Sequence, residues 1–370
     1  TQPESSAASD VYKRQKIMFL GLDIGRQYVK MVTAEKTKDG YRVLDAGSRL
    51  VPDANSAFDP EKIDRSHWVM AVRELFKQQS FNPKKAKSLI TGIGGSSASI
   101  KQITTMEMPS EELESAMTFE ARKHIPMDGT DAVIDYQILG SNKQEVDKID
   151  VGLVACTKGT LTNHMDLLKE CGLKAGIVDV NPIAMSNAFS FVKNMPEDGL
   201  VVMLDIGAVS SGLVVYGINQ QFFTRDLPIG SHHFVKEISE KKEIGYTQAQ
   251  DSLFKEGILA SKTQTDDVSQ EGSVSLAERT VYDSLVEDMR RSLRFYAKQT
   301  GQSFFLKIFL SGGGAPTPGL AEFVNQKLNI ECAVFDPFEN VEGKEKLSIS
   351  NPSQFTTALG LGIRGGMTSE

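Results

Sequence analysis

Residues 19–25 have the sequence FLGLDIG, and residues 202–207 repeat it almost unchanged as VMLDIG. In each copy an apolar run leads to an aspartate and a glycine, and a second apolar run follows at residues 29–32 or 213–216. This pattern predicts a β-hairpin made of a strand, a tight turn and a returning strand. Turns of the Asp-x-Gly type are common, so the prediction rests on the repetition within one chain.

The repeat predicts a ligand site between the two halves of the chain. If the hairpins face each other across a cleft, their backbone N–H groups can hold phosphate oxygens. The carboxylates of Asp23 and Asp205 can then hold a hydrated divalent cation. A third glycine-rich stretch, SGGGA at residues 311–315, follows an apolar strand expected at 304–310. Backbone without side chains allows an adenine or a ribose to lie against it.

Length and composition limit the class of protein. The 370 residues are enough for two domains, and 40% hydrophobic with 24% charged residues is ordinary for a globular protein. The net charge of −7 argues against nucleic acid as a partner, because such surfaces are basic. No apolar run reaches the roughly 20 residues of a membrane span. The three cysteines lack metal-ligand spacing and cannot all pair, which favours a reduced, cytoplasmic setting.

The order of the expected elements indicates two similar α/β halves, each with three strands followed by helices. In the first half we expect Asp59 to cap a helix that has Pro60 at its first position and ends near residue 79. Trp68 is expected to be a core residue of this helix. In the second half we expect helices at about 231–241, 247–255, 276–299 and 318–328, with a polar loop at 261–275.

These elements divide the chain as follows. Residues 1–15 are polar and are expected to be a disordered tail. The first domain is expected at 16–198, with a small α+β insertion at about 100–172. The second is expected at 199–352, with a helical subdomain at about 231–300. A last helix, at 353–364, is expected to pack on the first domain.

The elements, in this order and spacing, resemble the actin-like ATPase superfamily and, within it, the PilM family of type IV pilus assembly proteins, which is similar to the division protein FtsA. The likeness extends over about residues 17–364. Its most specific motifs are MPSEELE (108–114), FEARKHIP (119–126), TRDLPIG (224–230) and RSLRFY (291–296). It implies an α/β, actin-like (ribonuclease H-like) fold with duplicated domains around a nucleotide cleft and an inserted small α+β subdomain.

The resemblance also implies ATP or ADP and Mg²⁺ as cofactors. Asp23 and Asp205 would approach the metal through water molecules rather than bind it directly. The residues that would bind the nucleotide are Gly25, Arg26, Gln27 and Lys30 in a first phosphate loop, Gly207, Ala208, Val209 and Ser210 in a second, Gly312, Gly313 and Gly314 in an adenosine loop, and Lys255 and Arg291 near the nucleoside. Lys30 alone would be read as a solvated strand lysine, but beside this turn its ammonium can meet a phosphate.

Three positions depart from the pattern of the superfamily. Arg26 stands where a small serine or threonine is common, and Gln250 stands where a glutamate commonly contacts ribose. Asn181 stands where relatives often carry an acid that positions the attacking water. An amide can orient water but cannot accept its proton at neutral pH. With Asn181 and Asp179 as the candidate catalytic residues, we expect at most a weak ATPase.

The function that the resemblance implies is an ATP-binding cytoplasmic scaffold of the type IV pilus machinery. Its partner would be the N-terminal cytoplasmic segment of an inner-membrane protein like PilN, bound in a groove next to the insertion. The scaffold would thus be peripheral to the inner membrane without inserting into it. Two alternatives remain open. One is a sugar-type kinase with Asp179 as base, and the other is an FtsA-like filament former that self-associates.

Overall fold

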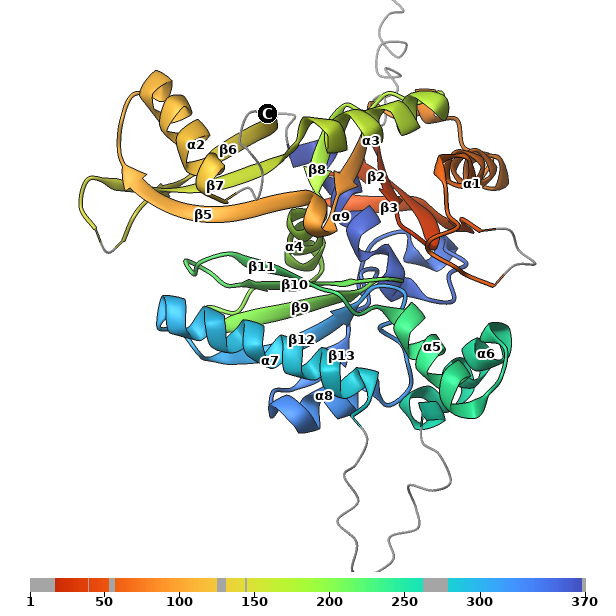
Figure 1. The fold of residues 1–370 in the computed structure, drawn as a ribbon. Helices are drawn as coiled ribbons and strands as arrows, with labels where there is room; N and C mark the ends of the chain where they lie inside the picture. Colours follow the sequence, from red (N-terminus) through yellow and green to blue (C-terminus); the bar gives the residue numbers. More distant parts are fainter. Residues whose placement is uncertain are drawn as a thin grey trace, which may run out of the picture.

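Two five-stranded sheets with the same strand order form the body of the molecule (Figure 1). The structure is a computed structural model, and it describes residues 17–38, 40–52, 57–124, 131–143, 145–261 and 279–367. The sheets have the orders β3-β2-β1-β4-β8 and β11-β10-β9-β12-β13. In both, three antiparallel strands are joined to two parallel ones. The repeated sequence therefore marks a repeated topology.

The bounds of the elements follow the predicted order. The strands are β1 (Met18–Ile24), β2 (Tyr28–Lys36), β3 (Tyr41–Leu50), β4 (Ser88–Ile93), β5 (Ala98–Met106), β6 (Ala132–Ser141), β7 (Lys148–Thr157), β8 (Ile177–Val180), β9 (Leu200–Ile206), β10 (Ser211–Tyr216), β11 (Phe223–Leu227), β12 (Phe305–Ser311) and β13 (Cys332–Val334). The helices are α1 (Arg65–Gln78), α2 (Ser110–His124), α3 (Lys158–Glu170), α4 (Asn181–Val192), α5 (Ser231–Lys242), α6 (Tyr246–Glu256), α7 (Val281–Thr300), α8 (Leu320–Leu328) and α9 (Thr356–Met367).

Side chains along β1 point alternately to the two faces of the first sheet, and a different layer of helices packs on each face. Leu20 and Leu22 point to one face, where they pack with Leu75 of α1 and Leu168 of α3. Gly21 points to the other face, which α9 covers. A Cβ on Gly21 would lie 2.1 Å from the carbonyl oxygen of Ala358, so only glycine allows the helix to approach so closely.

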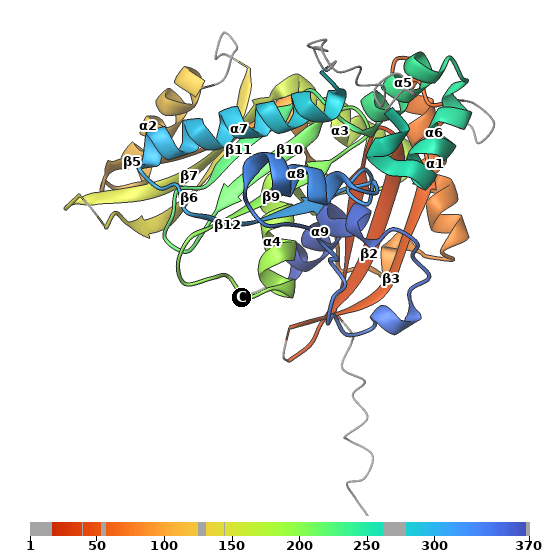
Figure 2. The ribbon, with the colours of Figure 1, turned by 90° about the horizontal axis from the view of Figure 1, so that it is seen from below.

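Helices α4 and α9 lie between the two sheets (Figure 1). Phe189 of α4 packs on the second sheet, against Met203 and Val214. Ala184 of the same helix contacts α9, since a Cβ on Gly360 would lie 1.7 Å from its carbonyl oxygen. The opposite face of the second sheet is covered by α7, α8 and the α5–α6 pair, whose apolar side chains share one core. Figure 2 shows this second layer from below.

Strands β5, β6 and β7 form a separate three-stranded sheet in the order β5-β7-β6. Its core is shared with α2, where Leu113 and Met117 pack on Val151 and Leu153. This unit and the α5–α6 pair lie at opposite ends of the molecule (Figures 1 and 2). Helix α3, which the sequence analysis places in the insertion, gives Leu168 to the core of the first sheet instead.

Several predicted boundaries are wrong by a few residues. Helix α1 begins at Arg65, because the carboxylate of Asp64 accepts hydrogen bonds from the N–H groups of Ser66 and His67. Asp59 caps a local turn, in which it accepts from the N–H of Glu61. The expected tail at 1–15, most of the loop at 261–275 and the last two residues of the FEARKHIP motif lie outside the described residues. In the described part of the chain, none of the helices combines the length and apolar character needed to cross a bilayer.

Candidate functional site

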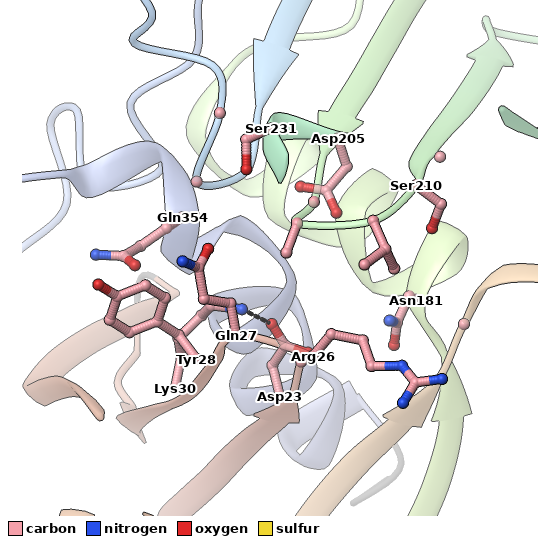
Figure 3. Close-up of a pocket in the computed structure, with 18 of the residues that line it drawn as sticks. Asp23, Arg26, Gln27, Tyr28, Lys30, Asn181, Asp205, Ser210, Ser231 and Gln354 are labelled. Carbon is pink, nitrogen blue, oxygen red and sulfur yellow. Dashed lines mark hydrogen bonds and ion pairs between the residues drawn. The ribbon is translucent and has the colours of Figure 1, made fainter. Parts of the chain in front are cut away.

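A cavity of about 650 Å³ lies between the two halves, and both repeated turns line it (Figure 3). The first turn joins β1 to β2, and the second joins β9 to β10. Both predicted hairpins are therefore present, and they face one space. The predicted residues that line it are Asp23, Gly25, Arg26, Gln27, Lys30, Asn181, Asp205, Gly207, Ala208, Val209, Ser210, Gly313 and Gly314.

The two turns have the same backbone geometry. The N–H of Gly25 donates to the carbonyl of Tyr28 at 3.1 Å, and the N–H of Gly207 donates to that of Ser210 at 3.0 Å. A Cβ on Gly25 would lie 2.7 Å from the Tyr28 oxygen, and one on Gly207 would lie 2.8 Å from the Ser210 oxygen. Each turn is thus tight enough to require glycine at its first position.

Backbone donors are available at the centre of both turns. Among the described residues, no group accepts a hydrogen bond from the N–H of Arg26, Gln27, Ala208 or Val209. Successive backbone N–H groups of this kind form a concave site for anions. The cavity therefore has two opposed sets of donors that suit phosphate oxygens.

The two aspartates differ in their partners. The carboxylate of Asp23 is paired with the ammonium of Lys30 at 2.7 Å, and both side chains are mostly buried. Asp205 is opposite Gly212 rather than a lysine, and the hydroxyl of Ser311 donates to it at 3.3 Å. Burial, with the nearby charge of Asp23, raises the pKa of Asp205 to about 6. A second negative charge is costly here, and a divalent cation would relieve that cost.

Asn181 reaches the cavity from the start of α4 and lies against β4. A Cβ on Gly92 would lie 2.2 Å from its Oδ1, and one on Gly94 would lie 2.4 Å from its Nδ2, so the two glycines make room for the amide. The Oδ1 atom is buried and has no hydrogen-bond partner among the described groups. An orphaned acceptor at the edge of a polar cavity can bind water or a ligand donor.

Other predicted residues lie away from the cavity. Gly312 lies behind it, where a Cβ would be 2.7 Å from Oδ1 of Asp205. Lys255 is exposed on α6 and is not part of the cavity wall, although Gln250 and Phe254 are. Asp179 faces Arg364 of α9, with 3.3 Å between carboxylate and guanidinium.

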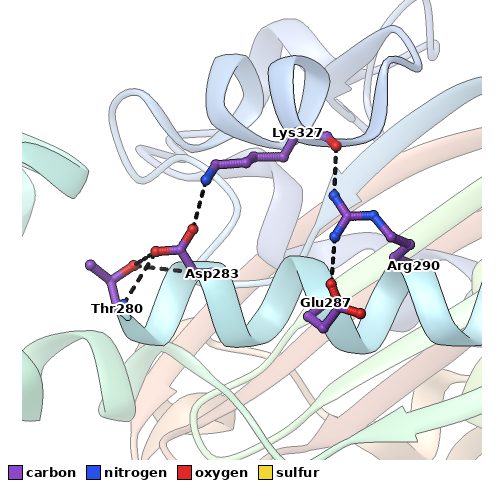
Figure 4. Close-up of polar contacts among 5 residues, drawn as sticks. All are labelled: Thr280, Asp283, Glu287, Arg290 and Lys327. Atoms are coloured by element: carbon purple, nitrogen blue, oxygen red, sulfur yellow. Dashed lines mark hydrogen bonds and ion pairs between the residues drawn. The ribbon is translucent and has the colours of Figure 1, made fainter. Parts of the chain in front are cut away.

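The arginines of α7 are committed to structural contacts. Arg291 pairs with Asp288 on its own helix. Arg290 pairs with Glu287 and donates to the carbonyl of Lys327, which links α7 to α8 (Figure 4). We therefore leave Arg291 and Lys255 out of the proposed site.

Several lining residues were not predicted from the sequence. Tyr28, Ser231, Tyr246, Asn351 and Gln354 line the cavity, and they come from four separate parts of the chain. Tyr28 lies within the predicted first phosphate loop, between Gln27 and Lys30. No local motif marks the other four, because tertiary folding brings them to the cavity.

Trp68 was also missed as a site residue. It packs partly on the first core, but its Nε1 donates to the carbonyl of Gly25 at 2.9 Å, and its ring lies 5.5 Å from the guanidinium carbon of Arg26. Its indole therefore supports the first turn from behind.

The residues present fit a nucleotide with a hydrated divalent cation. In the described ranges no cluster of three or more His, Cys, Asp or Glu residues is arranged to hold a metal. Mg²⁺ commonly binds one or two carboxylates and completes its shell with water and phosphate oxygens. Asp23 and Asp205 supply the carboxylates, and a ligand would have to supply the phosphates.

Comparisons with known proteins give a consistent result. A sequence profile of the family described as "Type IV pilus assembly protein PilM" matches residues 21–366. The cell division protein FtsA of Bacillus subtilis (strain 168) is 22% identical over 93% of this chain and 82% of its own length.

Solved structures share the fold. The chain in the "PilM-PilN type IV pilus biogenesis complex" has a TM-score of 0.75 and 22% identity, over 94% of this chain and 98% of that one. The ethanolamine utilization protein EutJ of Carboxydothermus hydrogenoformans has a TM-score of 0.52 and 14% identity, over 94% and 89% of the two chains.

Proposed function

The chain belongs to the family of the type IV pilus assembly protein PilM, and from this membership we propose that it is an actin-like scaffold that binds ATP or ADP with Mg²⁺ between its two halves. We also propose that it works in the cytoplasm, at the inner membrane, through a partner protein. The fold is the actin-like one, with duplicated α/β domains.

One observation carries the nucleotide proposal. Two turns with the same hydrogen bond and unpartnered N–H groups face one cavity, and each follows a strand whose next-to-last residue is an aspartate. This arrangement suits a chain of phosphates bound between two backbone cradles. Bound Mg²⁺ would neutralise phosphate charge. The residues Asp23 and Asp205 would hold its water ligands, and the ion pair with Lys30 would keep the Asp23 carboxylate oriented.

Filling the cavity without disturbing the fold tests this proposal. A Cβ on Gly313, which lines the cavity, would meet no atom within 4 Å. Gly313→Leu should therefore fold normally but weaken ATP–Mg²⁺ binding by more than about 100-fold in calorimetry, since its side chain occupies the ligand space. Gly159→Leu, at an exposed position in the first turn of α3, is the matched control and should bind like the unmodified chain. Equal binding by both variants would exclude this cavity as the site.

Turnover by this site should be slow. Asn181 can orient a water molecule through its unpartnered Oδ1, but it cannot take up the proton. Asp179, the carboxylate that a kinase would need as base, is paired with Arg364 outside the cavity wall. These positions favour a binding protein over the sugar-type kinase.

The partner proposal rests on the three-stranded sheet. Helix α2 covers one face of it, while Val133 and Leu139 of edge strand β6 are 37% and 54% exposed. The register places Val133 opposite Cys156, on the face away from α2. Leu139 lies on that face too, since a Cβ on Gly152 would be 3.6 Å from its Cδ2. We propose that this uncovered face borders the groove for the N-terminal cytoplasmic segment of a PilN-like protein.

Point variants test the partner proposal better than deletion of residues 100–172, because α3 belongs to the first core. Leu139→Asp should reduce capture of a synthetic PilN N-terminal peptide by at least about tenfold, since it places a charge in an apolar contact. Phe119→Asp, which is 61% exposed on α2, is the matched control. Unchanged capture by Leu139→Asp, or equal loss in both variants, would contradict the proposed groove.

A further inference from the structure

Among the described charged side chains that line the cavity, one basic residue has no acidic partner and is available to bind a ligand. The charged lining residues in the described part of the chain are Asp23, Asp205, Asp226, Arg26 and Lys30. Lys30 is paired with Asp23 at 2.7 Å. Arg26 is exposed and makes no ion pair with any described residue, so its guanidinium is the cation that a ligand can recruit.

Arg26 rests against an aromatic ring instead of a carboxylate. Its guanidinium carbon lies 5.5 Å from the centre of the Trp68 ring, which is fixed by the hydrogen bond from its Nε1 to the Gly25 carbonyl. A bidentate contact between a guanidinium and a phosphate is stronger than a cation–π contact at a partly exposed site. A phosphate within reach would therefore draw Arg26 from the ring.

The position of Arg26 in the cavity indicates which phosphate it would meet. Figure 3 shows Arg26 and Asn181 on one side, and Ser231 and Gln354 on the other. Ser231 adjoins Gly314, since a Cβ on that glycine would lie 3.2 Å from the Cβ of Ser231. If the nucleoside lies on the glycine loop, Arg26 is at the far end, where the terminal phosphate of a triphosphate would lie.

We propose that Arg26 distinguishes a nucleoside triphosphate from a diphosphate, and that Trp68 holds its guanidinium while the terminal phosphate is absent. This inference rests on the proposed nucleotide site. It would explain why the first turn carries an arginine at position 26, where the superfamily commonly has a small serine or threonine. It also gives an optical signal, because Trp68 is the single tryptophan of the chain.

Calorimetry with Mg²⁺ and either ADP or a non-hydrolysable ATP analogue tests the assignment. Arg26→Met should weaken binding of the triphosphate by roughly 10- to 30-fold, as expected for loss of a hydrogen bond to a charged group. Its binding of ADP should change by less than about threefold, since Arg26 does not meet the diphosphate in this arrangement. Arg49→Met removes an exposed arginine that is paired with Glu74, and it should leave both affinities unchanged.

Tryptophan fluorescence gives a second readout. In the unmodified chain the triphosphate should change the emission and ADP should not, and Arg26→Met should abolish this difference. Trp68→Phe keeps an aromatic ring but loses the donor to Gly25. Calorimetry should show weaker ADP binding, because the first turn loses this support, and a higher preference for the triphosphate over ADP, because a phenylalanine ring holds the guanidinium less strongly than an indole does.

The possible failures are distinguishable. If neither nucleotide binds the unmodified chain, the proposed nucleotide site and this inference both fail. If both bind but Arg26→Met lowers their affinities equally, or leaves the fluorescence response intact, only the role of Arg26 is overturned.

Discussion

The two hairpins that line the cavity share their backbone but differ in charge. Both turns close with a hydrogen bond from glycine to the residue three positions later. The register places Lys30 opposite Asp23 in the first hairpin, whereas Gly212 occupies the corresponding place opposite Asp205 in the second. One aspartate is thus neutralised within the chain, and the other is not. Duplication preserved the cradle, while the two copies diverged in how their carboxylates are balanced.

The largest test of this difference removes the internal cation. Lys30→Ala leaves Asp23 mostly buried, without a partner and near Asp205, so the free energy of unfolding should fall by about 2–4 kcal/mol at pH 7. Chemical denaturation without Mg²⁺ or nucleotide measures this change. Arg49→Ala, which breaks the exposed pair with Glu74, should cost less than about 1 kcal/mol. An equal cost for both would mean that the Asp23–Lys30 pair is no more than a surface contact.

The second test concerns Asp205, the aspartate that has no lysine opposite it. Asp205 has its pKa raised from 3.8 to about 6, so the folded chain binds this proton more tightly than the unfolded chain does. The unfolding free energy should therefore fall as pH rises from about 4 to 6, and the loss should be complete above that range.

Asp205→Asn should remove that loss. At pH 7, without Mg²⁺, we expect the variant to be about 1–3 kcal/mol more stable than the unmodified chain, with the difference gone near pH 4. Added Mg²⁺ and nucleotide should stabilise the variant less. Lower stability of Asp205→Asn at pH 7 would show that the carboxylate is favourably placed without a metal.

The smallest test makes the second hairpin resemble the first. Gly212→Lys introduces a lysine where a Cβ meets no atom within 4 Å, opposite Asp205. The new ammonium should lower the pKa of Asp205 and flatten the pH dependence between 4 and 6, by about 1 kcal/mol. Denaturation at both pH values measures the effect. An unchanged slope would mean that position 212 does not face the carboxylate as its register indicates.

The sequence predicted the fold best where one pattern was repeated. Asp23 and Asp205 each stand next to last in an apolar strand that leads into a glycine turn, and that local pattern was sufficient to predict two hairpins facing one cavity. Local capping rules were less decisive for α1. Asp59 and Asp64 both fit the start of a helix, and only the folded chain shows that the helix begins after Asp64.

Site residues that depend on distant packing could not be predicted. Trp68 is 43 residues from Gly25, and its hydrogen bond to that residue has no signature in either segment. Arg291 and Lys255 lie on helices of the second domain, where a shift of one position on a helix moves a side chain by about 100° around its axis. Their chemistry suited a nucleotide, but their orientation directs them elsewhere.

The fit of α9 against β1 has a consequence for how the chain is made. The first sheet begins near residue 18, yet one of its faces is covered by a helix that starts at Thr356. All the residues between β1 and α9 must emerge from the ribosome before that face can be buried. During synthesis the first domain therefore cannot complete its fold until the second domain and α9 have been made. A chaperone or a partner that covers the exposed face of the sheet would act before α9 is available.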